Sequence, residues 1–447
     1  MGLAHASTLN SVPSLRITRR AADRLRSGHL WVYRTDLEAQ QDSAPEPGAL
    51  VTITDSRNIP LGTALYSSAS QITARLVSRT PQLSRAQYLT DLRTRIHAAL
   101  ALRRELAPVT AVDNAHRLIF SEADNLPGIV ADRYNDLVLL QLLTQGTAQD
   151  DVRSVLVDSL TAGLASEGQT LTIWERPDPR IRELEELPPP PAGPLYSSTD
   201  SPLTTTVVTL NGLRFGYDAA SGQKTGAFLD QRLNYAAVAR AVQASGKTNN
   251  ALDICTYQGG FALHLAQVCA RVTGVDASRA TLEAADRNLA LNPGLRAETD
   301  WMEADAFVYL RHLDDLAHPH QSVISTRGGV PAAAVERPAG GAHLFDCIVL
   351  DPPAFAKSKR AAESALRGYK ELNLRALRLL APGGTLITCS CSHHVSLADF
   401  TAILAAAAAD AGRRVQLLET RAAAPDHPEI LTLPETRYLK CLLCRVD

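Results

Sequence analysis

Cysteine is missing from the first half of this chain. None precedes Cys255, and the seven that the sequence holds are an odd number. This distribution excludes a disulfide framework spanning the chain and fits a reducing cytosol. Cys441 and Cys444 have C-x-x-C spacing, but they stand in an apolar run and no second ligand pair is in sight. We therefore interpret them as buried strand cysteines and predict no metal site.

Signals for export or membrane anchoring are also lacking. Arg16, Arg19 and Arg20 are not followed by the apolar stretch of a secretory signal. Ala6 stands where N-myristoylation requires Ser or Thr. The alanine-rich run at 402–409 is too short to span a bilayer. We expect a cytoplasmic protein with no membrane partner.

An excess of positive charge is absent as well. The chain has 45 basic and 47 acidic residues, so its overall charge gives no general attraction to nucleic acid. The exception is local, since residues 1–90 hold ten arginines against six acidic residues. Such a patch is as consistent with a solvated surface as with RNA binding, in which Arg19 and Arg20 would contact the substrate.

The dinucleotide-binding pattern G-x-G-x-x-G does not occur in full, although a nucleotide-binding unit is indicated. An apolar strand at 251–255 leads into a glycine turn at 256–260 and a helix at 261–268. A second strand ends in Asp276, 23 positions after Asp253. Strand, glycine turn, helix, strand and terminal acid are the opening unit of a nucleotide-binding α/β domain.

Strands and helices alternate from this unit to the end of the chain. The predicted strands are 251–255, 272–276, about 299–304, 346–350, 384–389, about 415–419 and 436–443. This alternation predicts an α/β fold, a Rossmann-like, mostly parallel sheet with helices on both faces. We interpret residues 314–343, rich in Gly, Ala, Pro and His, as a disordered insertion.

Three further regions precede this domain. Residues 14–85 are predicted to form a small β-rich unit, and 86–106 a helical linker. Residues 107–220 are predicted to be a second, α+β unit that contains a hairpin turned at Asn211-Gly212. The α/β domain then occupies 221–447.

Short motifs that each contain an acidic residue stand where the predicted parallel strands end, the edge at which such sheets bind ligands. They are Asp253, Gly259 and Gly260; Asp276, Ala277 and Ser278; Asp305 and Ala306; and Asp351, Pro352, Pro353 and Phe355. Singly, each is as well explained by a helix cap or a rigid turn. Their succession at one strand end after another favours a ligand site.

The missing glycines decide between two cofactors. Asp253 and Cys255 stand where the pyrophosphate-binding glycines of a dinucleotide enzyme would begin. S-adenosylmethionine has no phosphate, and its ammonium, ribose and adenine suit Asp253, Asp276 and the Asp305-Ala306 pair. We therefore predict S-adenosylmethionine, with an NAD oxidoreductase as the distant alternative.

Two cysteines stand at the end of the fifth strand. Alternation would put Cys389 and Cys391 on one side of an ideal strand, but the strand should be ending by Cys391. We therefore predict that Cys389 is buried and that Cys391 can face the cleft. Carbon 5 of cytosine becomes nucleophilic when a thiolate adds to carbon 6, so a thiol beside a methyl donor suits cytosine-C5 methylation. Asp351 could then hydrogen-bond the ring nitrogen and stabilise the adduct.

These motifs together resemble the bacterial ribosomal RNA large-subunit methyltransferase I family, PUA-domain enzymes that form 5-methylcytosine in 23S rRNA. The resemblance covers nearly the whole chain. It rests on the segments 29–33, 66–75, 121–133, 222–232, 257–261, 351–355, 368–370, 390–392, 426–428 and 438–440 and on Asn373.

The resemblance implies an RNA-binding PUA domain at 14–85, a cofactor-bordering segment at 222–232 and Cys391 as the nucleophile. The implied cofactor residues are Lys224, Thr225, Phe228, Gln231, Arg232, Asp253, Tyr257, Gly259, Gly260, Asp276, Ala277, Ser278, Asp305, Ala306, Asp351 and Pro352. The implied substrate residues are Pro353, Phe355, Arg19 and Arg20. Unlike two-cysteine RNA methyltransferases, the chain has no cysteine after Asp351-Pro-Pro, so the base that removes the carbon-5 proton is unassigned.

The resulting hypothesis is an S-adenosylmethionine-dependent enzyme that forms 5-methylcytosine in 23S rRNA through a transient bond between Cys391 and cytosine carbon 6. One alternative is methylation of a base nitrogen, in which Asp351-Pro-Pro acts without a thiol. Another is a non-catalytic RNA-binding protein that keeps the cofactor fold. Whether the chain forms a homodimer is left open.

Overall fold

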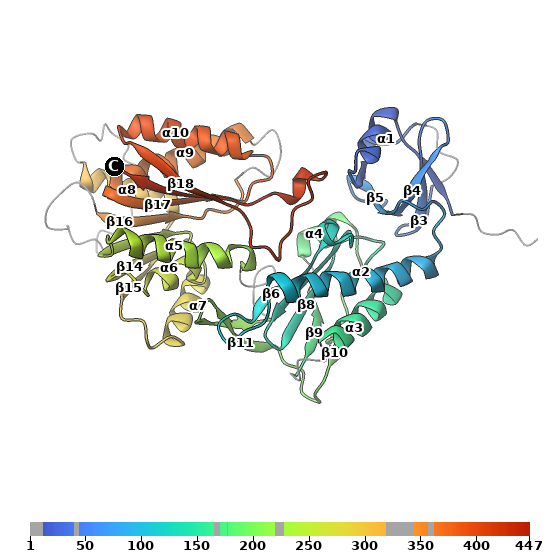
Figure 1. Cartoon of the computed structure of the whole chain (residues 1–447), viewed down its shortest axis with the longest axis horizontal. Helices are drawn as coiled ribbons and strands as arrows, with labels where there is room; N and C mark the ends of the chain where they lie inside the picture. The colour runs from blue at the N-terminus through green and yellow to red at the C-terminus, as the bar shows by residue number, and fades with distance from the viewer. Residues whose placement is uncertain are drawn as a thin grey trace, which may run out of the picture. The chain divides into compact units, whose positions relative to one another are not determined.

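The computed structural model describes residues 12–39, 44–164, 170–176, 178–219, 228–318, 344–355 and 362–447. The chain divides into two compact units, and Figure 1 labels their elements. The first unit comprises Met1–Val208, Tyr217–Gly226 and Pro425–Thr436, and the second comprises Thr209–Gly216, Ala227–Ala424 and Arg437–Asp447. Within the described ranges, no helix combines the length and the hydropathy needed to cross a bilayer.

The first unit begins with a small β-rich region. Its elements are β1 (Ser14–Arg16), α1 (Arg19–Arg26), β2 (Trp31–Tyr33), β3 (Leu50–Thr54), β4 (Pro60–Tyr66) and β5 (Ile72–Ser78). The strands form one sheet in the order β1-β3-β4-β5-β2. The side chain of Thr18 accepts the backbone N–H of Ala21 and so caps α1. Ala21, Ala22 and Leu25 of the helix are buried in the core of this region.

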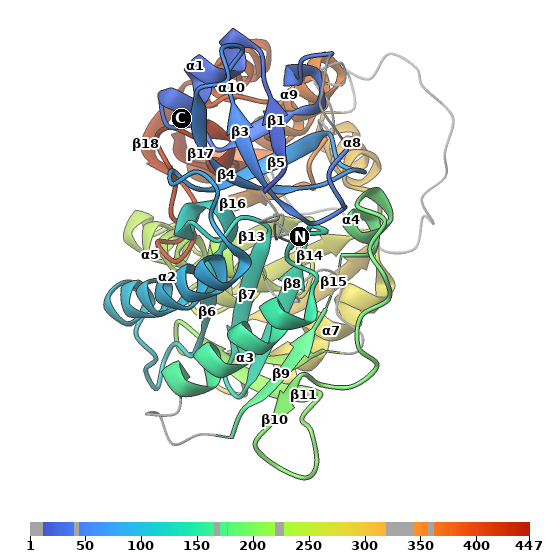
Figure 2. The same cartoon turned by 90° about the vertical axis from the view of Figure 1, so that its right-hand side faces the viewer.

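A second sheet of the first unit has helices on one face. Its elements are α2 (Arg85–Leu106), β6 (Ala115–Phe120), β7 (Ile129–Tyr134), β8 (Leu137–Leu142), α3 (Asp150–Leu164), β9 (Thr172–Glu175), α4 (Pro179–Leu184) and β10 (Tyr196–Ser197). The strand order is β10-β9-β8-β7-β6, and Figure 2 shows α2 and α3 running over the sheet. Leu92, Ile96 and Leu100 recur at helical spacing on α2 and are buried with Leu140 and Leu156. The predicted helix at 86–106 is confirmed.

The predicted hairpin is also confirmed. Strands β11 (Thr205–Leu210) and β12 (Leu213–Asp218) form a two-stranded sheet. Both turn residues are left-handed, Asn211 with φ 50° and Gly212 with φ 86°. A two-residue turn needs these angles to match the twist of its strands, and Asn-Gly tolerates them best.

The second unit is built on the predicted parallel sheet. Its strands are β13 (Asn250–Ile254), β14 (Arg271–Asp276), β15 (Glu298–Glu303), β16 (Phe345–Leu350), β17 (Leu380–Ser390), β18 (Val415–Arg421) and β19 (Lys440–Val446). The order is β15-β14-β13-β16-β17-β19-β18, and β19 is antiparallel to both of its neighbours. The last strand begins at Lys440 instead of 436, because a short 3₁₀ turn at Pro434–Thr436 precedes it.

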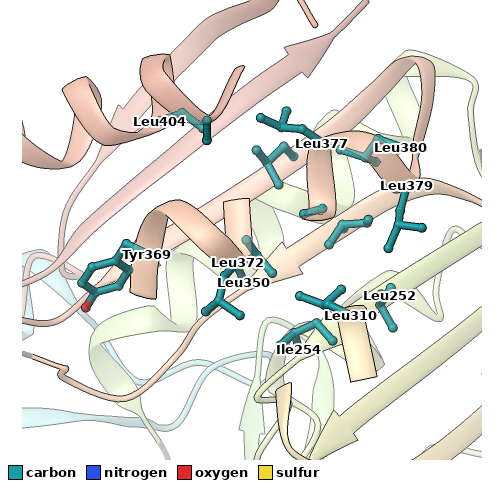
Figure 3. Close-up of a cluster of buried hydrophobic side chains, with 14 of the residues drawn as sticks. Leu252, Ile254, Leu310, Leu350, Tyr369, Leu372, Leu377, Leu379, Leu380 and Leu404 are labelled. Carbon is teal, nitrogen blue, oxygen red and sulfur yellow. The ribbon is translucent and has the colours of Figure 1, made fainter. Parts of the chain in front are cut away.

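Helices cover both faces of this sheet, as predicted (Figure 1). They are α5 (Arg232–Ser245) and α6 (Gly260–Leu265) on one face, α8 (Ala306–Ala317), α9 (Ala362–Leu379) and α10 (Leu397–Ala411) on the other, and α7 (Arg279–Ala290) beside β14 and β15. Figure 3 shows Leu252, Ile254 and Leu350 of the strands in one apolar cluster with Leu310 of α8 and Leu372 of α9. Each such fully buried side chain contributes roughly 1.5–3 kcal/mol relative to an exposed one.

The insertion predicted at 314–343 is wrong at its start. Residues up to Ala317 belong to α8, and Asp314 is buried there. The Asp314 carboxylate pairs with Arg375 of α9, and its Oδ1 lies 3.0 Å from Nε of Arg378. These ion pairs hold the end of α8 against α9, a tertiary contact that composition could not reveal. Residues 319–343 lie outside the described ranges.

Candidate functional site

The carboxyl ends of the parallel strands bring the predicted polar residues to one edge of the second unit's sheet. Asp276 is the last residue of β14, and Asp351 follows β16 directly. The backbone N–H of Asp351 donates to Ile254 O at 3.2 Å, and the N–H of Thr256 donates to Val275 O at 3.0 Å. Backbone hydrogen bonds thus join the neighbouring strand ends at the point where the predicted site residues begin.

The glycine turn after β13 has an unusual backbone. Cys255, Tyr257 and Gly259 all adopt positive φ, at 64°, 52° and 85°. Positive φ is uncommon for residues with a side chain and recurs at functional sites. The Asp276 carboxylate holds this turn, since Oδ2 accepts the Tyr257 N–H at 3.0 Å and Oδ1 accepts the Ser278 N–H at 2.9 Å. Each oxygen keeps a lone pair with which it can accept a hydroxyl of a ribose.

Asp253 lies buried beneath the turn. Its Oδ2 accepts hydrogen bonds from the Thr256 hydroxyl at 2.7 Å and from the Ala262 N–H at 2.9 Å. Its Oδ1 has no hydrogen-bond partner in the part of the chain that the structure describes. Burial raises the pKa of Asp253 to about 7. A buried carboxylate oxygen without a partner needs a donor, and the ammonium of an amino-acid ligand would supply one.

One carboxylate oxygen of Asp305 caps a helix. Oδ1 accepts the backbone N–H groups of Phe307 and Val308, both at 3.0 Å, and so caps α8. The helix-cap interpretation therefore holds for that atom. The residue is exposed at the strand-end edge, and Ala306 begins the helix beside it.

Three side chains orient Asp351. Nε2 of Gln231 donates to both carboxylate oxygens at 3.1 Å. The Gln231 carbonyl accepts from Nδ2 of Asn234 at 2.7 Å, and the Asn234 carbonyl accepts from Nε of Arg421 at 2.8 Å. This series fixes the Gln231 amide with its N–H group toward Asp351. Only Gln231 of the three positioning residues was among the predicted site residues.

The half-buried Asp351 is a weak acid. Burial, together with the charges of Asp230 and Asp253, raises its pKa to about 8, and the Gln231 hydrogen bond opposes this only in part. The carboxyl group is therefore mostly protonated at neutral pH and can donate a hydrogen bond.

The two cysteines near the end of β17 differ as predicted. Cys389 is fully buried, whereas Cys391 follows the strand and is half-buried. Sγ of Cys391 lies 3.9 Å from the carbonyl oxygen of Pro352, so the thiol faces the turn that begins with Asp351. Tyr369 of α9 holds the backbone beside it, because its hydroxyl lies 3.0 Å from Oγ of both Ser390 and Ser392.

Two further residues of the site had no predicted role. Cys255 shares the glycine turn, and burial and the charges of nearby acids, Asp276 and Asp351 first among them, raise its thiol pKa. Lys440 is buried next to the Ser390–Ser392 region, where Nζ donates to Ser392 O at 2.6 Å. The positive φ of Cys255 has no sequence signal. Lys440 belongs to a segment that resembles the family, but nothing in the sequence connects it with Cys391.

The remaining predicted site residues fall into several groups. Phe228 and Tyr257 form an edge-to-face pair with ring centroids 5.0 Å apart, and Arg232 is buried at the start of α5. Phe355 packs between Phe307 and Tyr369, with ring centroids 5.8 and 4.8 Å away. Gly259 and Gly260 start α6, while Ala277 and Pro353 are exposed and Pro352 is buried.

Arg19 and Arg20 are exposed on α1, in the first unit. Lys224 and Thr225 lie outside the described residues.

Comparison with known proteins is consistent with this geometry. Residues 15–79 match the PUA-like domain family, and residues 167–326 match the S-adenosylmethionine-dependent methyltransferase family. Ribosomal RNA large subunit methyltransferase I of Erwinia tasmaniensis is 34% identical over 419 residues, which cover 94% of this chain and 95% of the relative. The Salmonella arizonae protein of the same name is 32% identical over 443 residues, covering 98% and 99%.

Two solved structures share the fold. One, described as an S-adenosylmethionine-dependent methyltransferase from Streptococcus mutans, has a TM-score of 0.74 at 18% identity and covers 97% of this chain and 100% of its own. Another, described as a methyltransferase complexed with SAH, has a TM-score of 0.73 with the same identity and coverage. The predicted family, fold class and cofactor are confirmed. The chain belongs to the ribosomal RNA large subunit methyltransferase I family, with a PUA-like domain, an α/β methyltransferase fold and S-adenosylmethionine as its cofactor.

Proposed function

We propose that this protein methylates carbon 5 of a cytosine in 23S rRNA, with Cys391 as the nucleophile. One observation carries the proposal: the Cys391 thiol faces the Asp351-Pro352 turn, at the sheet edge where the cofactor residues gather. A base-nitrogen methyltransferase needs no thiol there. The relatives' name, ribosomal RNA large subunit methyltransferase I, supports ribosomal RNA as the substrate.

The cofactor contacts are proposed from the geometry of the turn. Asp253 Oδ1 would accept from the amino-acid ammonium, Asp276 from the ribose hydroxyls, and Asp305-Ala306 would border the adenine. Glycine at 259 and 260 lets the backbone approach the ligand. Other residues proposed to line the cofactor are Lys224, Thr225, Phe228, Gln231, Arg232, Tyr257, Ala277, Ser278, Asp351 and Pro352. S-adenosylmethionine supplies an electrophilic methyl group when bound.

In the proposed reaction Cys391 converts an unreactive carbon into a nucleophile. The thiolate forms a bond to cytosine carbon 6, and the electron pair of the ring double bond moves to carbon 5. Carbon 5 would then take the methyl group from the sulfonium of the cofactor, the sulfur–methyl bond breaking and S-adenosylhomocysteine being the leaving group. A base removes the proton from carbon 5, the double bond re-forms, and the carbon–sulfur bond breaks. Cys391 leaves as the thiolate with which it began.

Asp351 stabilises this adduct. Addition at carbon 6 pushes negative charge onto ring nitrogen 3, and a protonated carboxyl group beside it can donate a hydrogen bond. Because the pKa of Asp351 is raised to about 8, the group is present in that donor form at neutral pH. Pro353 and Phe355 would border the base, and Arg19 and Arg20 of the PUA-like domain would contact RNA phosphates.

The direct test compares ribosomal RNA from cells with and without this protein. We expect nucleoside mass spectrometry of 23S rRNA to show the loss of one 5-methylcytosine when the gene is deleted, and its return on complementation. The loss of an N-methylated base in its place would favour the base-nitrogen alternative. Unchanged modification of 23S rRNA would refute the proposal.

The affinity for the cofactor product is expected to rise with pH. Asp253 has a raised pKa of about 7, so its carboxylate is anionic above that pH and neutral below it. Only the anion pairs with the ligand ammonium, so S-adenosylhomocysteine should bind roughly tenfold more weakly at pH 6 than at pH 8. Isothermal titration calorimetry at pH 6, 7 and 8 measures this dependence.

Asp253→Asn provides the variant for that experiment. Loss of the charge-assisted hydrogen bond should weaken binding by about 1.5–3 kcal/mol and remove the pH dependence. The control is Asp346→Asn on the adjacent strand β16, whose carboxylate accepts the Asn249 N–H at 2.8 Å, at the opposite end of that strand. An affinity that does not vary with pH in the wild type would contradict the role given to Asp253.

A further inference from the structure

Lys440 is a buried cationic residue of the second unit. It is the first residue of β19 and only 4% exposed. Among the described residues, none of the carboxylates forms an ion pair with its ammonium group, whose hydrogen bonds go to two backbone carbonyls. Burying a charge without a counter-charge costs several kcal/mol. A nearby anion would offset this cost.

The position of Lys440 points to the source of this anion. In the antiparallel pairing of β17 with β19, Lys440 stands opposite Ser390. Its Nζ donates to Ser392 O at 2.6 Å and to Tyr438 O at 2.8 Å. Cys391 is the residue between Ser390 and Ser392. Because an ammonium has three N–H donors, one remains after these two carbonyls are satisfied.

The electrostatics of the pair agree with this placement. Burial lowers the pKa of Lys440 to about 8, and the negative charge of Cys391 acts in the opposite direction. Within the described chain, Cys391 is the one ionisable group whose charge is felt by Lys440. The interaction is mutual, so an ammonium at this position must favour the thiolate of Cys391.

We propose that Lys440 is a positioning residue that keeps Cys391 as a thiolate in the resting protein, as an ammonium–thiolate pair. The pair forms when the thiol proton moves to the amine, so no proton is released and no outside reactant is needed. The inference rests on the proposed function, since this thiolate is the group that adds to cytosine carbon 6. When the carbon–sulfur bond breaks, the leaving thiolate returns beside the same ammonium.

Other titratable groups face the pair. Tyr369 of α9 contacts Ser390 and Ser392 through its hydroxyl, and its pKa is raised, chiefly by burial, so it stays neutral. His393 is exposed, and its ring centroid lies 5.7 Å from that of Tyr438, whose hydroxyl donates to Asp230 at 2.6 Å. The Asp351 turn also faces Cys391, through the Pro352 carbonyl. The effect on the thiol is assigned to Lys440 because its ammonium group lies at the Ser392 carbonyl and interacts electrostatically with Cys391.

The test is the pH dependence of Cys391 alkylation in the full-length protein. Iodoacetamide reacts with the thiolate, and peptide mass spectrometry resolves carbamidomethyl-Cys391 from the buried Cys389. We expect a reaction midpoint at least one pH unit below that of an ordinary thiol, about 8.5. Lys440→Met should raise the midpoint by one unit or more and slow alkylation at pH 7 about tenfold. Lys440→Arg, which keeps the charge, should leave the midpoint low.

The matched control is Lys370→Met on α9, where the lysine pairs with Asp410 at 2.7 Å on the protein surface. It should leave the midpoint unchanged. A wild-type midpoint at 8.5 or above would overturn the inference without any variant, which keeps the test decisive even if Lys440→Met does not fold. So would an identical midpoint in a folded Lys440→Met protein. Retention of 5-methylcytosine formation by Cys391→Ala would instead refute the proposed function and leave the alkylation result standing.

Discussion

Replacing Cys391 with alanine is expected to abolish methyl transfer to ribosomal RNA. The cytosine ring has no other route to a nucleophilic carbon 5 in the proposed mechanism, so loss of the thiolate should lower the rate by about three orders of magnitude or more. The measurement is transfer of a radiolabelled methyl group to ribosomal RNA lacking this modification. Cofactor affinity should stay within a few-fold of the wild type, because Cys391 is not among the residues proposed to hold it.

The same mechanism predicts a covalent complex between the protein and a modified RNA, which denaturing gel electrophoresis can detect. RNA carrying 5-fluorocytidine at the target has no proton to lose from carbon 5, so the bond to Cys391 should persist. The matched control is Cys389→Ala, two positions earlier on β17 and fully buried. It should still form the covalent complex, whereas Cys391→Ala should not. A covalent complex formed by Cys391→Ala would show that another side chain is the nucleophile. Normal turnover by Cys391→Ala without a covalent complex would support the base-nitrogen alternative.

Replacing Asp351 with alanine is expected to lower kcat/KM by about 10²–10³, the usual effect of removing one preorganised donor to a developing negative charge. The dependence of kcat/KM on pH shows which protonation state of Asp351 supports the reaction. With its pKa raised to about 8, Asp351 is protonated below that pH and ionised above it, so kcat/KM of the wild type should fall as pH rises through about 8. Steady-state kinetics between pH 6 and 9.5 test this.

The variant Asp351→Asn keeps a hydrogen-bond donor at this position but removes the ionisable carboxyl group. An amide still donates a hydrogen bond but has no proton to lose, so this variant should keep more activity than Asp351→Ala and lose the alkaline decline. Asp346→Asn, at the other end of the same strand, should reproduce the wild-type profile. If kcat/KM of Asp351→Asn still falls at alkaline pH, the titrating group responsible for that fall is not Asp351.

Local sequence signals predicted most of the residues that gather at the candidate site. The turn after β13 was predicted because apolar residues, glycines and a terminal acid at 23 residues' distance occur in the order that the fold needs. Alternation alone puts Cys389 and Cys391 on one side of a strand, and the two were distinguished because the strand had to end near Cys391. The end of α8 was misjudged, because the ion pairs of Asp314 with α9 join residues about 60 positions apart.

By itself, the amino-acid sequence determined the order of strands and helices in the α/β domain, the edge of the sheet at which the candidate site lies and the choice of cofactor. All three follow from patterns within short stretches, such as apolar periodicity, glycine in a turn and an acid after a strand. Tertiary structure alone decided the surroundings of the side chains proposed to react. Gln231 orients Asp351 across 120 residues, and Lys440 meets the Cys391 region across 48. Burial and charge set a pKa, and both depend on which distant segments the fold packs together.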